Sequence, residues 1–151
     1  MTLTEKKAMA SLLVSALIYS YLSVNLADAW TIPDQSAQHL WSTWIIVLGF
    51  GMMGEVSVGA WSAWQRKRGE LEDDRDEAII ARAERLALVS GFCGINVLIW
   101  QILWQATFSH PIITTLDVQH LPTLFFVLMS ILFLCHGVKQ FFILLLSLLS
   151  T

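Results

Sequence analysis

The chain has 151 residues, of which 56% are apolar and only 14% are charged, and its formal net charge is −3. Soluble globular chains carry about 45–50% apolar and about 25% charged residues, so the composition excludes an ordinary soluble domain and a disordered chain. The two cysteines, Cys93 and Cys135, both lie inside apolar stretches, which excludes a disulfide scaffold. The composition therefore indicates an integral membrane protein.

Four apolar stretches carry most of this excess, and each is near the roughly 20 residues that a helix needs to cross a bilayer. The sequence predicts transmembrane helices over residues 8–27, 41–64, 87–108 and 121–142. The first stretch is longer than the ~7–15 apolar residues of a cleaved leader, so no cleavage is expected. The predicted fold is all-α: one membrane domain, 1–151, formed by a bundle of four transmembrane helices. The apolar tail 143–151 either extends the fourth helix or lies along the membrane surface.

The positions of the basic residues predict the orientation in the membrane. All nine Lys and Arg residues lie before the first predicted span, between the second and third, or late in the fourth. The linkers 28–40 and 109–120 contain neither residue type. Because Lys and Arg accumulate on the cytoplasmic side, we expect both termini and the charged loop 65–86 to be cytoplasmic.

The loop 65–86 holds thirteen of the twenty-one charged residues and ends in a helical pattern. Its acidic residues can cap the start of a helix and complement the positive end of the helix dipole. One interpretation is a solvated helix start with salt-bridged sides. The alternative is a docking surface for a cytoplasmic partner, formed by Asp73, Asp74, Arg75 and Asp76.

The same segment resembles a known signature. Asp73-Asp-Arg-Asp-Glu-Ala-Ile-Ile-Ala-Arg-Ala is similar to the D-E-R-D-x-x-I-x-x-x-A motif of small, uncharacterised prokaryotic four-span membrane proteins, where it also lies between spans two and three. The resemblance implies a four-helix membrane fold in the prokaryotic inner membrane, and it implies no activity. Those proteins tend to end the fourth helix with aromatic residues and Arg-Arg-Gly, whereas here Gln140-Phe141-Phe142 precedes Ile-Leu-Leu-Leu.

Glu55 is the most informative residue, because it lies about nine residues, or some 13 Å of helix, from Trp64 and so inside the hydrocarbon. An acidic group there costs roughly 2.5–3.5 kcal/mol on insertion scales, and such groups usually face the bundle interior or water. Gly51 and Gly59 share its helix face, which favours close backbone approach and homo-oligomerisation. Asn96 of the third span is about as deep. Glu55 either forms a structural hydrogen bond with Asn96, or ionises to bind a cation or carry protons.

Other candidate residues are weaker. Trp100 and Trp104, one helical turn apart, can stack on a cationic or aromatic ligand, although such pairs are more often packing. The ligand-binding residues expected from the sequence are therefore Glu55, Asn96, Trp100 and Trp104. No spacing typical of a metal site, a cofactor motif or a catalytic triad is visible, so no metal, cofactor or enzyme activity is expected.

The sequence leaves two functions open. The first is a small transport, channel-like or ligand-binding membrane module centred on Glu55. The second is a non-transporting accessory or regulatory membrane protein whose charged loop docks a partner. The expected partners are the lipid bilayer, a second copy of the chain and a cytoplasmic or membrane protein, and no nucleic acid is expected. A polar, water-accessible path around Glu55 favours the first function, and a dry interior favours the second.

Overall fold

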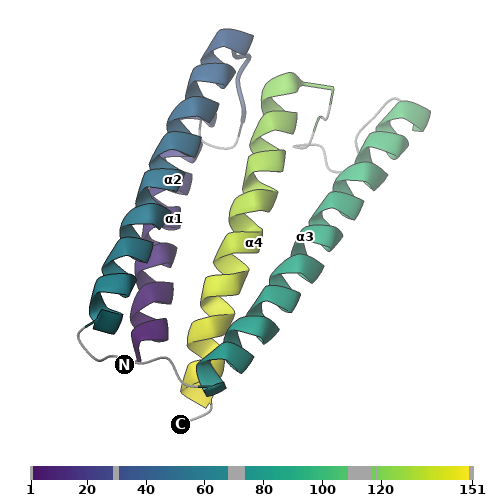
Figure 1. Cartoon of the computed structure of the whole chain (residues 1–151). Coiled ribbons are helices and arrows are strands. Elements are labelled where there is room, and N and C mark those ends of the chain that lie inside the picture. Colours follow the sequence, from purple (N-terminus) through teal and green to yellow (C-terminus); the bar gives the residue numbers. More distant parts are fainter. Residues whose placement is uncertain (1, 29–30, 68–73, 109–116, 118, 150–151) are drawn as a thin grey trace.

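The computed structural model of the chain describes residues 2–28, 31–67, 74–108, 117 and 119–149 (Figure 1). Within these residues it holds four helices: α1 (Leu3–Leu26), α2 (Ala37–Lys67), α3 (Asp74–Phe108) and α4 (Leu121–Leu149). All four are long and apolar enough to cross a membrane. The predicted all-α fold with four candidate membrane spans is therefore confirmed.

Local sequence signals explain where the helices begin. At the start of α1, the Thr2 hydroxyl accepts a hydrogen bond from the Glu5 amide at 3.2 Å, and the Glu5 carboxylate accepts one from the Thr2 amide at 3.0 Å. This reciprocal capping satisfies amide groups that the first helical turn leaves free. Pro122 is the second residue of α4, where its missing N–H removes no helical hydrogen bond.

All four helices extend beyond the apolar stretches that predicted them, and α3 extends the most. α3 begins at Asp74, so most of the charged loop 65–86 consists of helical turns that continue directly into the third span. Ala, Glu, Arg and Leu dominate these turns, and all four residue types favour the helix. α4 continues past Lys139 to Leu149, so the apolar tail extends the fourth helix as far as the structure describes it.

The helices are arranged as an open array around α4. α4 packs against α1 on one side and α3 on the other, and α2 packs mainly against α1. Figure 1 shows α4 between α3 and the pair formed by α1 and α2. The start of α1, the end of α2, the start of α3 and the end of α4 lie together at one end of the molecule, which we call the charged end.

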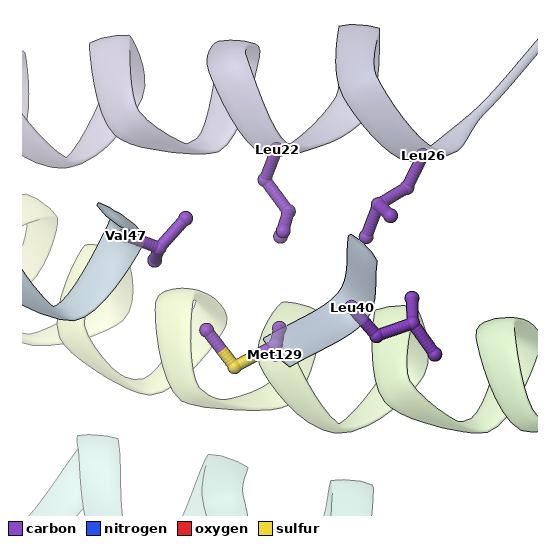
Figure 2. Packing of buried hydrophobic residues seen from close by; sticks show 5 residues of the cluster. All are labelled: Leu22, Leu26, Leu40, Val47 and Met129. Atoms are coloured by element: carbon purple, nitrogen blue, oxygen red, sulfur yellow. The ribbon is translucent and has the colours of Figure 1, made fainter. Parts of the chain in front are cut away.

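Apolar side chains pack in two separate clusters along the helices. The cluster nearer the opposite end joins three helices and is drawn in Figure 2: it consists of Leu22, Leu26, Leu40, Val47 and Met129. The cluster at the charged end joins α1, α3 and α4 and consists of Ala8, Ile79, Ala83 and Ile143. Most other large apolar side chains point outward, as expected for helices whose surroundings are lipid rather than water.

The close approach between α1 and α2 occurs at Gly54. A Cβ atom added there would collide with Cγ1 of Val14, whereas none of the neighbouring atoms lies within 4 Å of a Cβ added at Gly51 or Gly59. The structure therefore shows no close approach within the chain at Gly51 or Gly59, and association of a second copy through their face stays a prediction. The contact between α1 and α2 occurs instead at Gly54, one residue before Glu55.

Hydrogen bonds and an ion pair join α1, α3 and α4 towards the charged end. The buried Thr4 hydroxyl of α1 donates a hydrogen bond to Oδ2 of Asp76 in α3 at 3.0 Å, and Asp76 is only 6% exposed. The Ser147 hydroxyl of α4 donates to the Glu5 carboxylate of α1. Lys139 of α4 pairs with Glu84 of α3, with Nζ and Oε1 2.8 Å apart. These contacts hold α1 and α3 against the end of α4.

We expect Thr4→Val to lower the stability of the protein in detergent by about 1 kcal/mol, because the buried Asp76 carboxylate loses a hydrogen-bond donor. The matched control is Thr107→Val: the Thr107 side chain is exposed and bonds only within α3, to the Leu103 carbonyl. Thermal unfolding of both variants checks the expectation. Equal effects of the two substitutions would contradict it.

Candidate functional site

A group of hydrogen-bonded polar side chains lies between the two apolar clusters. We call this group, formed by Ser11, Glu55, His136 and Gln140, the polar cluster. The Ser11 hydroxyl donates a hydrogen bond to Oε1 of Glu55 and lies 2.9 Å from Nε2 of His136. Nε2 of Gln140 donates to the same hydroxyl at 3.2 Å. Ser11 is therefore the centre of the cluster.

Three helices supply these side chains. Ser11 lies in α1, eight residues or about 12 Å of helix from Leu3, and Glu55 lies in α2, about 18 Å from Lys67. His136 and Gln140 are four residues apart in α4 and therefore lie on one face of that helix. All four residues belong to candidate membrane spans, where water is scarce and unpaired polar groups are costly.

Burial is uneven across the cluster. Ser11 is 1% exposed and Gln140 is also buried, whereas 44% of the Glu55 side chain is exposed. The cluster is thus closed at Ser11 and open at Glu55. A carboxylate in this position is reached from outside the packed helices while it stays bonded to groups inside them.

The hydrogen bonds define where the protons can be. Ser11 has one hydroxyl proton and gives it to Glu55, so its contact with His136 requires a proton on Nε2 of the imidazole. Oε1 of Glu55 and Nε2 of His136 are 3.5 Å apart. If Glu55 is protonated instead, the Glu55–Ser11 and Ser11–His136 hydrogen bonds can both reverse, while the Gln140 amide still donates to Ser11. The arrangement therefore supports two proton distributions without a change of helix position.

The structure does not bring Glu55 and Asn96 together. Asn96 is exposed on α3, and its Nδ2 donates to the Phe92 carbonyl of the same helix at 2.8 Å. The expected hydrogen bond between Glu55 and Asn96 is therefore wrong. Equal depth is not sufficient for contact, because α4 separates α3 from the pair of helices to which Glu55 belongs.

The tryptophan pair also lies apart from the polar cluster. Trp100 and Trp104 belong to α3, with ring centroids 6.0 Å apart and planes inclined by 46°, and Trp104 contacts Phe108 at 4.3 Å. Rings tilted in this way pack on one another and do not form two parallel walls for a flat ligand. Nothing in their geometry favours the ligand role over packing.

The residues expected to dock a partner have different surroundings. Asp73 and the Asp74 side chain lie outside the described residues. Arg75 is exposed, and its Nη2 donates to the Ser147 carbonyl at 3.5 Å. Asp76 is buried against Thr4. Asp76 therefore does not contribute to an exposed docking surface in this structure, because its carboxylate joins α3 to α1.

A second polar group lies at the end opposite the charged end. Nε2 of His120 is 2.9 Å from Oδ1 of Asp34, which connects the start of α4 to the segment before α2. Gln105 of α3 donates to Asp117 at 2.5 Å. This hydrogen bond, with one from the Gln119 amide, holds the pKa of Asp117 below its usual value. Among the described residues, no three His, Cys, Asp or Glu side chains are grouped to hold a metal ion.

Sequence reasoning missed the partners that Glu55 has in the structure. None of Ser11, His136 and Gln140 was predicted as a site residue from the sequence. The available signal was the four-residue spacing of His136 and Gln140 on an otherwise apolar helix. Nearer the opposite end, Tyr19 of α1 bonds to Ser130 of α4, with the two hydroxyl oxygens 3.1 Å apart.

Comparison of the chain with family models, with curated proteins and with solved structures gave no match. The polar cluster and its hydrogen bonds are therefore the basis for assigning a function.

Removing the Ser11 hydroxyl should uncouple Glu55 from His136 and Gln140. We expect Ser11→Ala to destabilise the protein in detergent by about 1 kcal/mol, because Glu55 and the buried Gln140 both lose a hydrogen bond. Ser15→Ala, one helical turn away on the same helix, is the matched control and should have little effect. A double-mutant cycle of Ser11→Ala with Glu55→Leu should give a coupling of about 0.6–2 kcal/mol. A coupling of zero would show that the two residues do not interact.

Proposed function

We propose that this chain is a small multi-pass membrane protein that binds and transfers protons at the polar cluster, as a transport or ligand-binding module. The observation that carries the proposal is the convergence of Glu55 and His136 on one buried serine hydroxyl. Both residues can gain or lose a proton, and ionisable residues inside membrane spans commonly mark proton relays or ion pathways.

The proton transfer follows from the hydrogen bonds. Starting from an imidazolium and a carboxylate, Nε2 of His136 gives its proton to Oγ of Ser11 while the Ser11 hydroxyl proton moves to Oε1 of Glu55. The products are a neutral imidazole, an unchanged serine hydroxyl and a neutral carboxylic acid. The positive and negative charges disappear together, which lowers the desolvation cost of keeping both groups in an apolar environment.

The uneven burial defines where the cluster is accessible. The Glu55 and His136 side chains are 44% and 31% exposed, so either group can exchange a proton with a molecule that reaches it, whereas Ser11 and Gln140 are buried. The apolar clusters of Leu22 and Ala8 lie on the two sides of the polar cluster along α1. This arrangement favours binding and release at a central site over an open, continuously hydrated channel.

The proposal includes the location of the chain in the membrane, its orientation and its association with a second copy. The four apolar helices support insertion in a bilayer, and the one-sided distribution of Lys and Arg supports cytoplasmic termini and an inner-membrane location. The exposed face of α2 with Gly51 and Gly59 supports association with a second copy, since small residues allow close helix packing in lipid. The resemblance of the charged segment to the four-span family agrees with this placement.

The accessory function remains the alternative proposal. It now depends on the exposed charges of the first turns of α3, such as Arg75, Glu77 and Arg82, since Asp76 is buried. In that case the polar cluster would serve only to join three helices. Glu55→Gln separates the two proposals because glutamine keeps the shape and a hydrogen-bond acceptor but carries no exchangeable charge.

Under the transport proposal, Glu55→Gln should fold normally and lose pH-dependent proton flux in liposomes. The flux is measured with a pH-sensitive dye enclosed in the liposomes after a pH gradient is imposed. Glu84→Gln is the matched control: it also neutralises a glutamate, but at the charged end, and should keep the flux. A Glu55→Gln variant with the wild-type flux would overturn the proposal.

Glu55→Leu tests the structural contribution of the same side chain. It leaves Ser11 and His136 without their acceptor, so we expect a loss of about 1–2 kcal/mol or less in stability, as for other hydrogen bonds in membranes. Glu55→Gln should retain most of that stability. Thermal unfolding in detergent compares the two, and equal losses would contradict the hydrogen-bonding role.

Orientation is tested by cysteine labelling in a background with Cys93→Ser and Cys135→Ser. An impermeant external reagent should label Asp34→Cys and should not label Lys67→Cys in intact cells, because the basic residues predict that the end of α2 is cytoplasmic. Membrane disruption should make both positions reactive. External labelling of Lys67→Cys alone would reverse the proposed orientation.

A further inference from the structure

An apolar groove runs between α3 and α4 from the charged end towards the middle of the helices. Its volume is about 570 Å³, and its walls are mostly aliphatic or aromatic. The lining residues are Glu84, Ala87, Leu88, Gly91, Phe92, Ile95, Cys135 and Lys139. From Glu84 to Ile95 the groove follows eleven residues of helix, about 16 Å, which is comparable to much of one leaflet of the hydrocarbon core.

The two charged residues of this lining, Lys139 and Glu84, lie together at the end of the groove that is nearer the charged end. Nζ of Lys139 is 2.8 Å from Oε1 of Glu84, and 52% of the Glu84 side chain is exposed. The pair is therefore accessible, electrically balanced and placed where an apolar groove meets the charged end. A ligand complementary to this site has an anionic group for Lys139, a cationic group for Glu84 and an apolar chain for the groove.

We propose that the groove binds a glycerophospholipid whose headgroup carries both a phosphate and a primary ammonium group, with one acyl chain lying between α3 and α4. The lipid phosphate accepts hydrogen bonds from Lys139, and the lipid ammonium donates to Glu84. Four charges then alternate in sign, and neither protein side chain is left without an opposite charge. The inference is independent of the proton-transfer function.

The glutamate decides which headgroup fits. An anionic headgroup without an amine would meet Lys139 but would place its negative charge beside Glu84, and like charges at this distance repel. A choline headgroup has the correct charges, but its quaternary ammonium has no N–H to donate to the carboxylate. A primary amine satisfies both side chains, so the site should select it.

Native mass spectrometry of the full-length protein in detergent tests this selection. The protein is mixed with equal amounts of dioleoyl phosphatidylethanolamine, phosphatidylcholine and phosphatidylglycerol, so that only the headgroup differs. We expect the ethanolamine lipid to bind roughly three- to thirtyfold more tightly than the other two, the ratio that one additional hydrogen bond in a membrane gives.

Variants identify the site. Lys139→Gln and Glu84→Gln should each abolish the preference, whereas Lys67→Gln, which removes an exposed lysine outside the groove, should retain it. The exchange Glu84→Lys with Lys139→Glu keeps an ion pair between α3 and α4 and should also keep the preference. This double variant is the control for unfolding, because it changes both residues but keeps the ion pair between the two helices.

Three results would overturn the proposal. Equal binding of the three lipids would show that the groove does not select a headgroup. Preference for phosphatidylglycerol would mean that basic residues alone attract lipid. An ethanolamine preference that survives both Lys139→Gln and Glu84→Gln would place the selective site elsewhere on the protein.

Discussion

The structure depends on one requirement, that a carboxylate carried into an apolar helix must find hydrogen-bond partners there. Glu55 meets it through the hydroxyl of Ser11 and the nearby imidazole of His136. An unpaired acidic group in the hydrocarbon would cost roughly 2.5–3.5 kcal/mol on insertion scales. The partners come from α1 and α4, so satisfying Glu55 fixes α2 relative to both helices. The same contacts place two groups that can exchange protons within one hydrogen-bonded chain.

The remaining packing is consistent with this centre. The apolar cluster around Leu22 and Met129 lies on one side of it, and the cluster around Ala8 and Ile143 lies on the other. Within the described part of the chain, α3 joins the assembly chiefly through α4 and through the Thr4–Asp76 hydrogen bond at the charged end. Because α3 provides no member of the polar cluster, its long groove with α4 is available for a separate role. The proposed proton chemistry therefore involves α1, α2 and α4, whereas the proposed lipid binding involves α3 and α4.

The sequence was sufficient to predict the helices but not their neighbours. Length and hydropathy identify a membrane helix from local composition alone, so all four candidate spans appear in the structure. The partner of Glu55 depends on which helices are neighbours and on how each helix is rotated about its axis. Neither can be inferred from the depth of a residue in its span. Asn96 was chosen by depth, and it faces away on α3. Asp76 looked like surface charge, yet it is buried, because the apolar residues Ile79 and Ala83 turn that side of α3 inward.

The central claim is that Glu55 and His136 exchange one proton through Ser11, and infrared difference spectroscopy in lipid measures this directly. On a change of temperature at constant pH, which shifts the internal proton equilibrium without adding protons, the carbonyl band of a protonated carboxylic acid should appear as the imidazolium band of isotope-labelled histidine disappears. The carbonyl band should be absent in Glu55→Gln, and Ser11→Ala should uncouple the two signals. Bands that change independently in the wild-type protein, or a carbonyl band that persists in Glu55→Gln, would contradict the account.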